Sequence, residues 1–226
     1  MSTPKERLGR LVELASQGEA ARPTLAHELC DVLLDWPPDY PSAARLPFEA
    51  LLEKALREVD RDTRIQIAAR LARRADAPID ILNELFFAAS PEMKDEIVAR
   101  NASEGLLPIG GPDYVDEASL LDAARGDMGE FIAAFASALG VRETIANEIL
   151  SDSSVQSLAL ACKGIRVGRA TFSAIAVLSD RMRAAEDSYS RLAVYDTVPE
   201  CAAERMLAFW RSQREAESQA FDKAAE

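Results

Sequence analysis

Apolar residues recur with helical spacing along almost the whole chain. From Lys5 to Ala224 the period is close to 3.6 residues, and no segment shows the two-residue alternation that indicates a half-buried strand. Prolines precede the apolar runs, where the first turn of a helix loses no hydrogen bond to them. These prolines are Pro23, Pro47, Pro78, Pro91 and Pro199. We therefore expect an all-α protein built from about ten short helices.

The N-terminal half contains an internal repeat. Residues 51–71 align with residues 81–101 without a gap, at an offset of 30 residues. In the second helix of each copy, a cation is followed by apolar residues three and four positions later. An earlier copy of this second helix begins "RPTLAHEL". These recurrent cations are Arg22, Arg64 and Lys94. Repeats of this length predict helix pairs that bury their apolar stripes by stacking on their neighbours.

The stretch "LLEKALREVDRDTRIQIAARLARR" resembles a HEAT-type repeat, with Asp60 or Asp62 at the turn and Arg64 in the second helix. Residues 8 to about 160 are also similar to an uncharacterised bacterial family of HEAT-like helical proteins. The resemblance implies a HEAT-like repeat, an α-solenoid, in the N-terminal half. This half would pack with a C-terminal helical bundle or with a continuation of the solenoid. The resemblance implies no catalytic residues.

Glycine and proline mark a boundary in the middle of the chain. The segment "NASEGLLPIGGPDYVDEA" contains Gly110, Gly111 and Pro112, which break any helix. We predict HEAT-like repeats over 1–104, a linker over 105–116 and a C-terminal helical region over 117–226. In the last helix, apolar residues at helical spacing predict a buried stripe. The stripe consists of Ala203, Met206, Leu207 and Trp210.

Six arginines fall within the eighteen positions from 57 to 74, although the formal net charge of the chain is -12. The cation at Arg64 recurs in other copies, which indicates a structural role. We expect Arg64 to pair with Asp60, with Asp62 or with carbonyl groups of the turn. We assign Arg22, Arg64, Lys94 and Trp210 to the scaffold. Arg73 and Arg74 have no counterparts in the other copies, and we assign Arg70, Arg73 and Arg74 to a partner-binding surface.

The residues that common catalytic sites need are scarce. His27 is the single histidine, so no Ser-His-Asp or Cys-His arrangement and no H-E-x-x-H metal helix is predicted. Its triplet "HEL" faintly resembles the phosphoacceptor helix of sensor kinases. Because His27 lies among apolar residues, we favour a structural role. The three cysteines lack a CxxC pair, and we expect buried thiols and no metal or cofactor.

These observations favour a non-catalytic protein–protein interaction module, an adaptor or a regulator. The alternative is a HEAT-like nucleic-acid-processing enzyme with a local arginine groove. A sequence pI near 4.7 disfavours nucleic acid, which is itself a polyanion. Apolar runs are too short to span a membrane, and the N-terminus lacks signal-peptide features, so we expect a cytoplasmic protein. The partner is expected to be a protein, and a homo-oligomer is compatible with the sequence.

Overall fold

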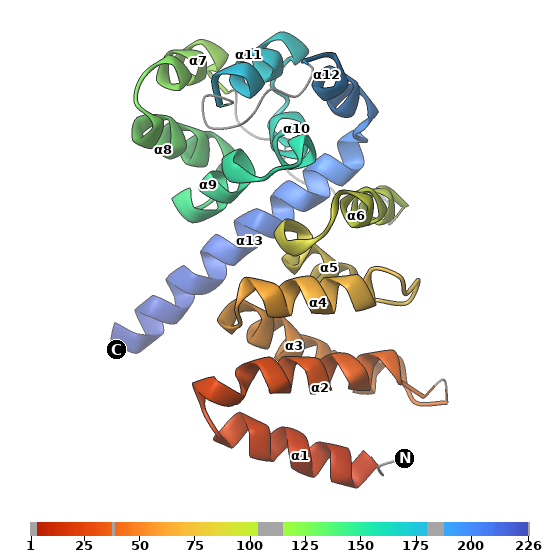
Figure 1. The fold of residues 1–226 in the computed structure, drawn as a ribbon. Helices are drawn as coiled ribbons and strands as arrows, with labels where there is room; N and C mark the ends of the chain where they lie inside the picture. Colours follow the sequence, from red (N-terminus) through yellow and green to blue (C-terminus); the bar gives the residue numbers. More distant parts are fainter. Residues whose placement is uncertain (1–3, 38, 104–114, 180–187, 226) are drawn as a thin grey trace. The chain divides into compact units, whose positions relative to one another are not determined.

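The fold is all-helical in the part of the chain that the structure describes. The structure is a computed structural model, and it describes residues 4–37, 39–103, 115–179 and 188–225. These residues contain no β-strand (Figure 1). The predicted all-α class is therefore confirmed. Residues 105–114 of the predicted linker, with the turn "PIGGPDY", lie outside the described residues.

The chain divides into two compact units, Met1–Ile97 and Val98–Glu226, with the division inside the sixth helix. Most elements of the first unit are α-helices of 11 to 13 residues. They are α1 (Pro4–Ser16), α2 (Arg22–Leu34), α3 (Leu46–Glu58), α4 (Arg61–Leu71), the shorter α5 (Ile79–Glu84) and α6 (Pro91–Ser103). Three 3-10 turns connect them: η1 (Glu19–Ala21), η2 (Ser42–Ala44) and η3 (Phe86–Ala88).

The second unit consists of shorter helices and one long one. They are α7 (Glu117–Arg125), α8 (Met128–Leu139), α9 (Glu143–Ser151), α10 (Val155–Gly164), α11 (Arg169–Ser179), α12 (Ser188–Thr197) and α13 (Glu200–Ala225). Helices that follow one another in the chain contact each other from α7 to α10, and α11 also returns to contact α7. Within this unit α10 packs against α13 (Figure 1).

Helices of the first unit contact their neighbours along the chain. Helix α2 contacts α1, α3 and α4, while α3 contacts α5 and α4 contacts η3. The core between them is made of aliphatic side chains and one phenylalanine, all fully buried: Leu29, Leu33, Leu52, Leu56, Ile67, Leu71 and Phe86. Each helix therefore supplies one buried stripe, as its sequence period predicts.

Helix ends follow the signals in the sequence. Asp60 caps α4 by accepting a hydrogen bond from Thr63 N at 2.8 Å, and Ser90 Oγ accepts one from Met93 N at 3.4 Å before α6. Gly140 ends α8 in the left-handed conformation, with φ of 71°, which glycine adopts without steric cost. Ser90 before a first-turn proline and Gly140 after an apolar run are local signals in the sequence for a helix start and a helix end, and the structure has both.

The last helix is fixed by its apolar stripe. Ala203, Met206, Leu207 and Trp210 are all buried, as the spacing predicts. Gly164, the final residue of α10, lies against Ala203 and Leu207 of this stripe. A methyl group added there would be 3.0 Å from Leu207 Cδ2 and 3.1 Å from Ala203 O. The sequence indicates only a helix end at Gly164, whereas the structure also requires a close approach of α10 and α13.

We expect Gly164→Ala to lower the free energy of unfolding by about 1–3 kcal/mol, because the methyl group overpacks this contact. Gly9→Ala in α1 is the matched control, since a methyl group there meets nothing within 4 Å. The control is expected to be neutral or to stabilise by up to ~1 kcal/mol, through helix propensity. Chemical denaturation of both variants measures the difference. Equal stability of the two would show that α10 and α13 do not approach as closely as described.

Candidate functional site

The arginines predicted to bind a partner differ in how far they are already paired. Arg70 forms an ion pair with Asp31, which ties α4 to α2. Arg74 Nε lies 3.0 Å from Asp76 Oδ1. Arg73 is exposed, and no ion pair of it occurs within the described residues. Arg73 is thus the member of this predicted set with the greatest freedom to meet another molecule.

A buried carboxylate lies among charged groups of α3, α4 and α5. The Glu84 side chain is buried, and Arg57 Nε lies 3.4 Å from its Oε2. Arg57 also pairs with Glu53 on its own helix. Burial raises the pKa of Glu84, while the positive charges of Arg57 and Arg64 act in the opposite direction. The positive charges of Arg57 and Arg64 therefore stabilise the ionised form of the buried Glu84 carboxyl group.

The surroundings of Arg64 differ from those we expect from the sequence. Asp60 is engaged by Thr63, whose backbone and hydroxyl hydrogen bonds lower the pKa of Asp60. The backbone N–H of Arg64 donates to Asp60 O at 3.2 Å, but within the described part of the chain no hydrogen bond joins the Arg64 side chain to Asp60 or Asp62. Its charge acts on Glu84 instead. Closeness in the sequence favours Asp60 and Asp62 as partners of the Arg64 side chain. As the N-cap of α4, however, Asp60 uses its carboxylate to accept a hydrogen bond from a backbone amide.

The other two recurrent cations also contact the scaffold. Arg22 Nε lies 2.9 Å from Glu58 Oε2, which joins the start of α2 to the end of α3. Lys94 is 2% exposed, and its Nζ lies 5.3 Å from the centroid of the Phe86 ring. Such a position is favourable for a cation over an aromatic face. The three cations at equivalent repeat positions thus meet three different surroundings.

Arg45 holds the loop between α4 and α5 beside the start of α3. Its Nη2 donates to Asp76 O at 3.0 Å, and its Nε lies 2.8 Å from Glu49 Oε1. Asp76 belongs to the segment that follows Arg73 and Arg74. The contact therefore brings the exposed end of the arginine run close to the first turn of α3.

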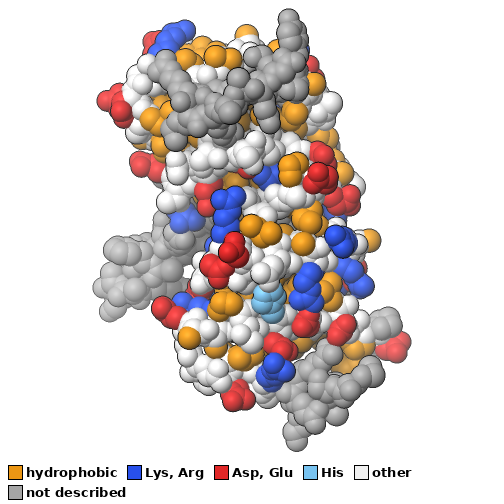
Figure 2. Space-filling view, viewed as in Figure 1, with side chains coloured by type: hydrophobic (Ala, Val, Ile, Leu, Met, Phe, Trp, Pro, Cys, Tyr) orange, Lys and Arg blue, Asp and Glu red, His pale blue; other side chains and the backbone are white. Residues whose placement is uncertain are grey.

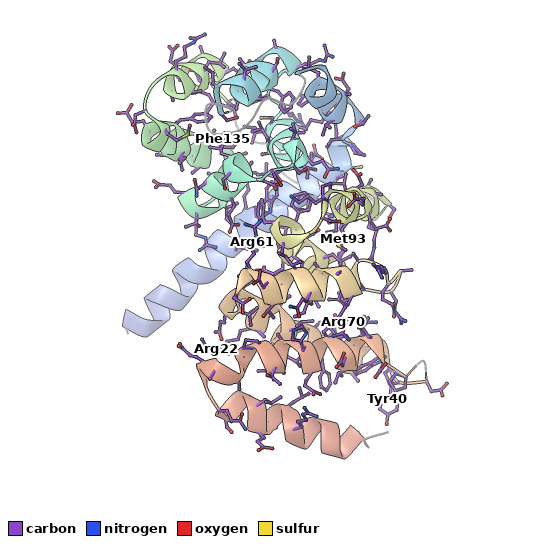
Figure 3. The ribbon with its side chains drawn as sticks, viewed as in Figure 1. Arg22, Tyr40, Arg61, Arg70, Met93 and Phe135 are labelled. Carbon is purple, nitrogen blue, oxygen red and sulfur yellow. The ribbon has the colours of Figure 1, made fainter. Side chains whose placement is uncertain are left out.

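Three large apolar side chains are exposed on α3 and on the segment before it. Tyr40, Leu46 and Leu51 are 54%, 61% and 53% exposed, and we call these three residues the α3 patch. The Trp36 ring lies beside two aromatic rings of this segment, because its centroid lies 6.3 Å from that of Tyr40 and 5.6 Å from that of Phe48. Tyr40 lies at the edge of the first unit, on the segment between α2 and α3 (Figure 3). Helical periodicity did not indicate this patch, although the segment "DWPPDYPSAARLPF" between two helices is rich in apolar residues.

Charges of both signs are mixed on the surface. Figure 2 shows lysine and arginine side chains interspersed with acidic ones on the visible face, without a continuous basic band. Arg61 and Arg70 lie near opposite ends of α4 (Figure 3). The arginine run therefore does not form one basic stripe on this face.

His27 and Cys30 lie in α2, where they have different surroundings. His27 is half-buried beside the fully buried Ala26, and its structural role stays a prediction. The Cys30 thiol is fully buried, and burial raises its pKa to about 11. A thiol with such a pKa is protonated at neutral pH and is a poor nucleophile. Cys30 is therefore a packing residue.

In the second unit, polar side chains join the ends of several helices. Glu117 Oε1 accepts a hydrogen bond from Gly168 N at 3.0 Å, and its Oε2 accepts one from the Thr171 hydroxyl. Tyr195 Oη donates to Val167 O at 2.6 Å. Burial raises the pKa of Tyr195. These bonds satisfy backbone groups around the turn from α10 to α11, so the cluster serves the fold.

The described residues offer neither a metal-binding cluster nor a membrane-spanning helix. Among the described residues, no group of three or more His, Cys, Asp or Glu side chains could hold a metal ion. The helices in the described ranges include none with the length and apolar character needed to cross a bilayer.

Comparison with protein families finds a match for part of the second unit. Residues 113–208 match the model of a family described as an uncharacterised protein conserved in bacteria (DUF2336). The similarity to an uncharacterised bacterial family is thus found over residues 113–208, whereas we expected it over residues 8 to about 160; the HEAT-like character of the predicted repeats, which precede the matched range, stays a prediction. Comparisons with curated proteins and with solved structures gave no significant match.

We expect Arg64→Ala to destabilise the protein by about 1–3 kcal/mol at neutral pH, because the buried Glu84 carboxylate loses one of its two compensating cations. The loss should shrink as the pH falls through the raised pKa of Glu84, since the protonated acid no longer needs the cation. Arg61→Ala, an exposed position on the same helix, is the control and should stay within ~0.5 kcal/mol of the parent. Urea unfolding at neutral and acidic pH measures both. A loss independent of pH would separate Arg64 from Glu84.

The buried Cys30 thiol predicts a stability change in alkali. Its pKa in the folded state is about 11, above the ordinary thiol value of 9.0, so the unfolded chain loses this proton first. The contribution of Cys30 is complete below pH 9 and is lost as the pH rises toward 11. A difference of two pKa units between the folded and the unfolded state corresponds to roughly 2–3 kcal/mol in the free energy of unfolding. Unfolding measured from pH 8 to 11 should show a shallower decline for Cys30→Ala than for the parent, and parallel curves would contradict the burial of the thiol.

Proposed function

We propose that this protein is a non-catalytic interaction module, an adaptor or a regulator that presents a helical-repeat surface to a protein partner. The first unit is the binding part in this proposal, arranged as a HEAT-like solenoid. The three free cysteines suit a reducing compartment such as the cytoplasm. The α3 patch is the single observation that carries the proposal.

The packing of the first unit supports this function. Helix α2 contacts α1, α3 and α4, and α3 contacts α5, so helix faces that point away from these contacts are available to another molecule. Several ionisable groups form contacts within the unit, as at Glu84, Asp60 and Asp31. Within the described residues, no such polar contact accounts for the exposed apolar side chains of the α3 patch, and exposed apolar areas mark interaction sites.

The alternative of a nucleic-acid-processing enzyme needs the arginines to converge. Arg57, Arg70 and Arg74 each form an ion pair with an acid. Each paired arginine contributes less to the field that would attract a phosphate backbone. In the part of the chain that the structure describes, no observation favours a groove.

The proposed function is tested by crosslinking the full chain inside the cells that produce it and identifying the attached proteins by mass spectrometry. We expect a small set of proteins crosslinked at stoichiometric levels through the first unit. Each is then purified and titrated against the full chain, and micromolar or tighter binding is expected for a genuine partner. Crosslinks confined to copies of the same chain, or no saturable binding to any candidate, would overturn the proposal.

The companion prediction concerns DNA. We expect random duplex DNA to bind more weakly than ~10⁻⁴ M at physiological salt, which is below ordinary non-specific binders. Fluorescence anisotropy with a labelled duplex measures this directly. Micromolar affinity that falls steeply with salt and is lost in an Arg73→Ala, Arg74→Ala double variant would instead support the arginine groove.

A further inference from the structure

Helix α12 is held in the second unit with little burial of apolar side chains. Of its described side chains, from Leu192 to Thr197, none is buried, and Leu192, Val194 and Tyr195 are half-buried. Helix α9 has a similar length, 9 residues against 10 in α12, and buries four of its side chains. They are Ile145, Ala146, Ile149 and Leu150. Removal of apolar area from water therefore stabilises the position of α12 less than that of α9.

Tyr195 contacts two buried residues around the turn from α10 to α11. Its hydroxyl donates to Val167 O at 2.6 Å, and its ring stacks on the Phe172 ring with 4.6 Å between the centroids. Val167 and Phe172 are 1% and 0% exposed. The half-buried Tyr195 thus covers side chains that belong to the interior of the second unit.

Two cations hold the C-terminal end of α12, which lies beside α10 and α11 (Figure 1). Lys163 Nζ donates to Val198 O, just beyond α12, and Arg169 donates to both carboxylate oxygens of Asp196 at 3.0 Å. Cations are favoured at this end of a helix by the helix dipole. The Arg169 and Asp196 side chains are 58% and 48% exposed, and an ion pair as exposed as this is weak and is screened by salt.

We propose that α12 is a latch, which detaches from α10 and α11 while the rest of the second unit stays folded. This inference goes beyond the proposed function, which places binding in the first unit. Elements that open locally are those with few buried apolar side chains and with polar contacts open to solvent, and α12 has both properties. Detachment would uncover Val167 and Phe172, so the second unit would have two states that differ in exposed apolar surface.

The connection to α13 permits this movement. Val198 is 5% exposed, and it lies between α12 and the first turn of α13. Helix α13 keeps its own buried stripe, which ends at Trp210, and α10 packs against it. The contacts that fix α13 therefore do not include the side chains of α12 that hold the latch.

Hydrogen–deuterium exchange of the full chain, read by mass spectrometry and corrected for intrinsic rates, tests the latch. We expect the amides within α12 to exchange about 100-fold faster or more than those within α9, because local opening costs less free energy than opening of the unit. Tyr195→Phe keeps the ring and removes the hydrogen bond to Val167 O, and Arg169→Ala removes the ion pair. Each should speed exchange of α12 several-fold and leave α9 unchanged. Salt at about 1 M, where screening acts within ~3 Å, should speed exchange of α12 in the parent but not further in Arg169→Ala.

Arg125→Ala is the matched control for Arg169→Ala, because Arg125 pairs with Asp122 inside α7 and both side chains are exposed. Tyr40→Phe is the control for the tyrosine change, since Tyr40 is 54% exposed and lies in the first unit. Neither control should alter the exchange of α12. Equal exchange of α12 and α9 in the parent, no change in Tyr195→Phe and Arg169→Ala, or an equal rise in all helices of the second unit would each overturn the latch.

Discussion

Short helices depend on burial by their neighbours. An isolated helix of 11 to 13 residues, the length of most helices in the first unit, is marginal in water. The chain solves this by burying apolar side chains between helices, as with Leu52 and Leu56 of α3, a helix that contacts α2 and α5. Each helix depends on burial of its apolar side chains by the helices beside it. Ionic contacts between helices adjust how the helices lie against each other, but they do not provide the main stabilisation.

The charged residues illustrate this secondary role. Arg22 with Glu58, Arg70 with Asp31 and Arg45 with Asp76 each join two separate segments of the first unit. Exposed ion pairs contribute little energy, but they fix how segments lie against each other. In the second unit Arg211 has a comparable position, since its Nε donates to Leu139 O at 2.6 Å and satisfies the end of α8. Polar contacts thus set local geometry on a scaffold that apolar burial stabilises.

Much of the fold is readable from the sequence, because helix period, N-caps and first-turn prolines are local signals. The stripe ending at Trp210 and the stop at Gly140 follow from spacing alone. The candidate site is less readable, since it depends on contacts between distant positions. The repeat directs attention to Arg64, but not to Glu84, which lies 20 positions further along the chain. The α3 patch could not be predicted, because the exposure of a leucine depends on what packs against α3. The sequence of one helix does not contain that information.

Each unit contains one fully buried thiol, Cys30 in the first and Cys162 in the second. A thiol reagent cannot reach either sulfur until the surrounding helices separate. The rates at which the two cysteines are labelled therefore report the opening of each unit separately, in the intact chain. The protein carries its own internal measure of whether its halves unfold together or one at a time.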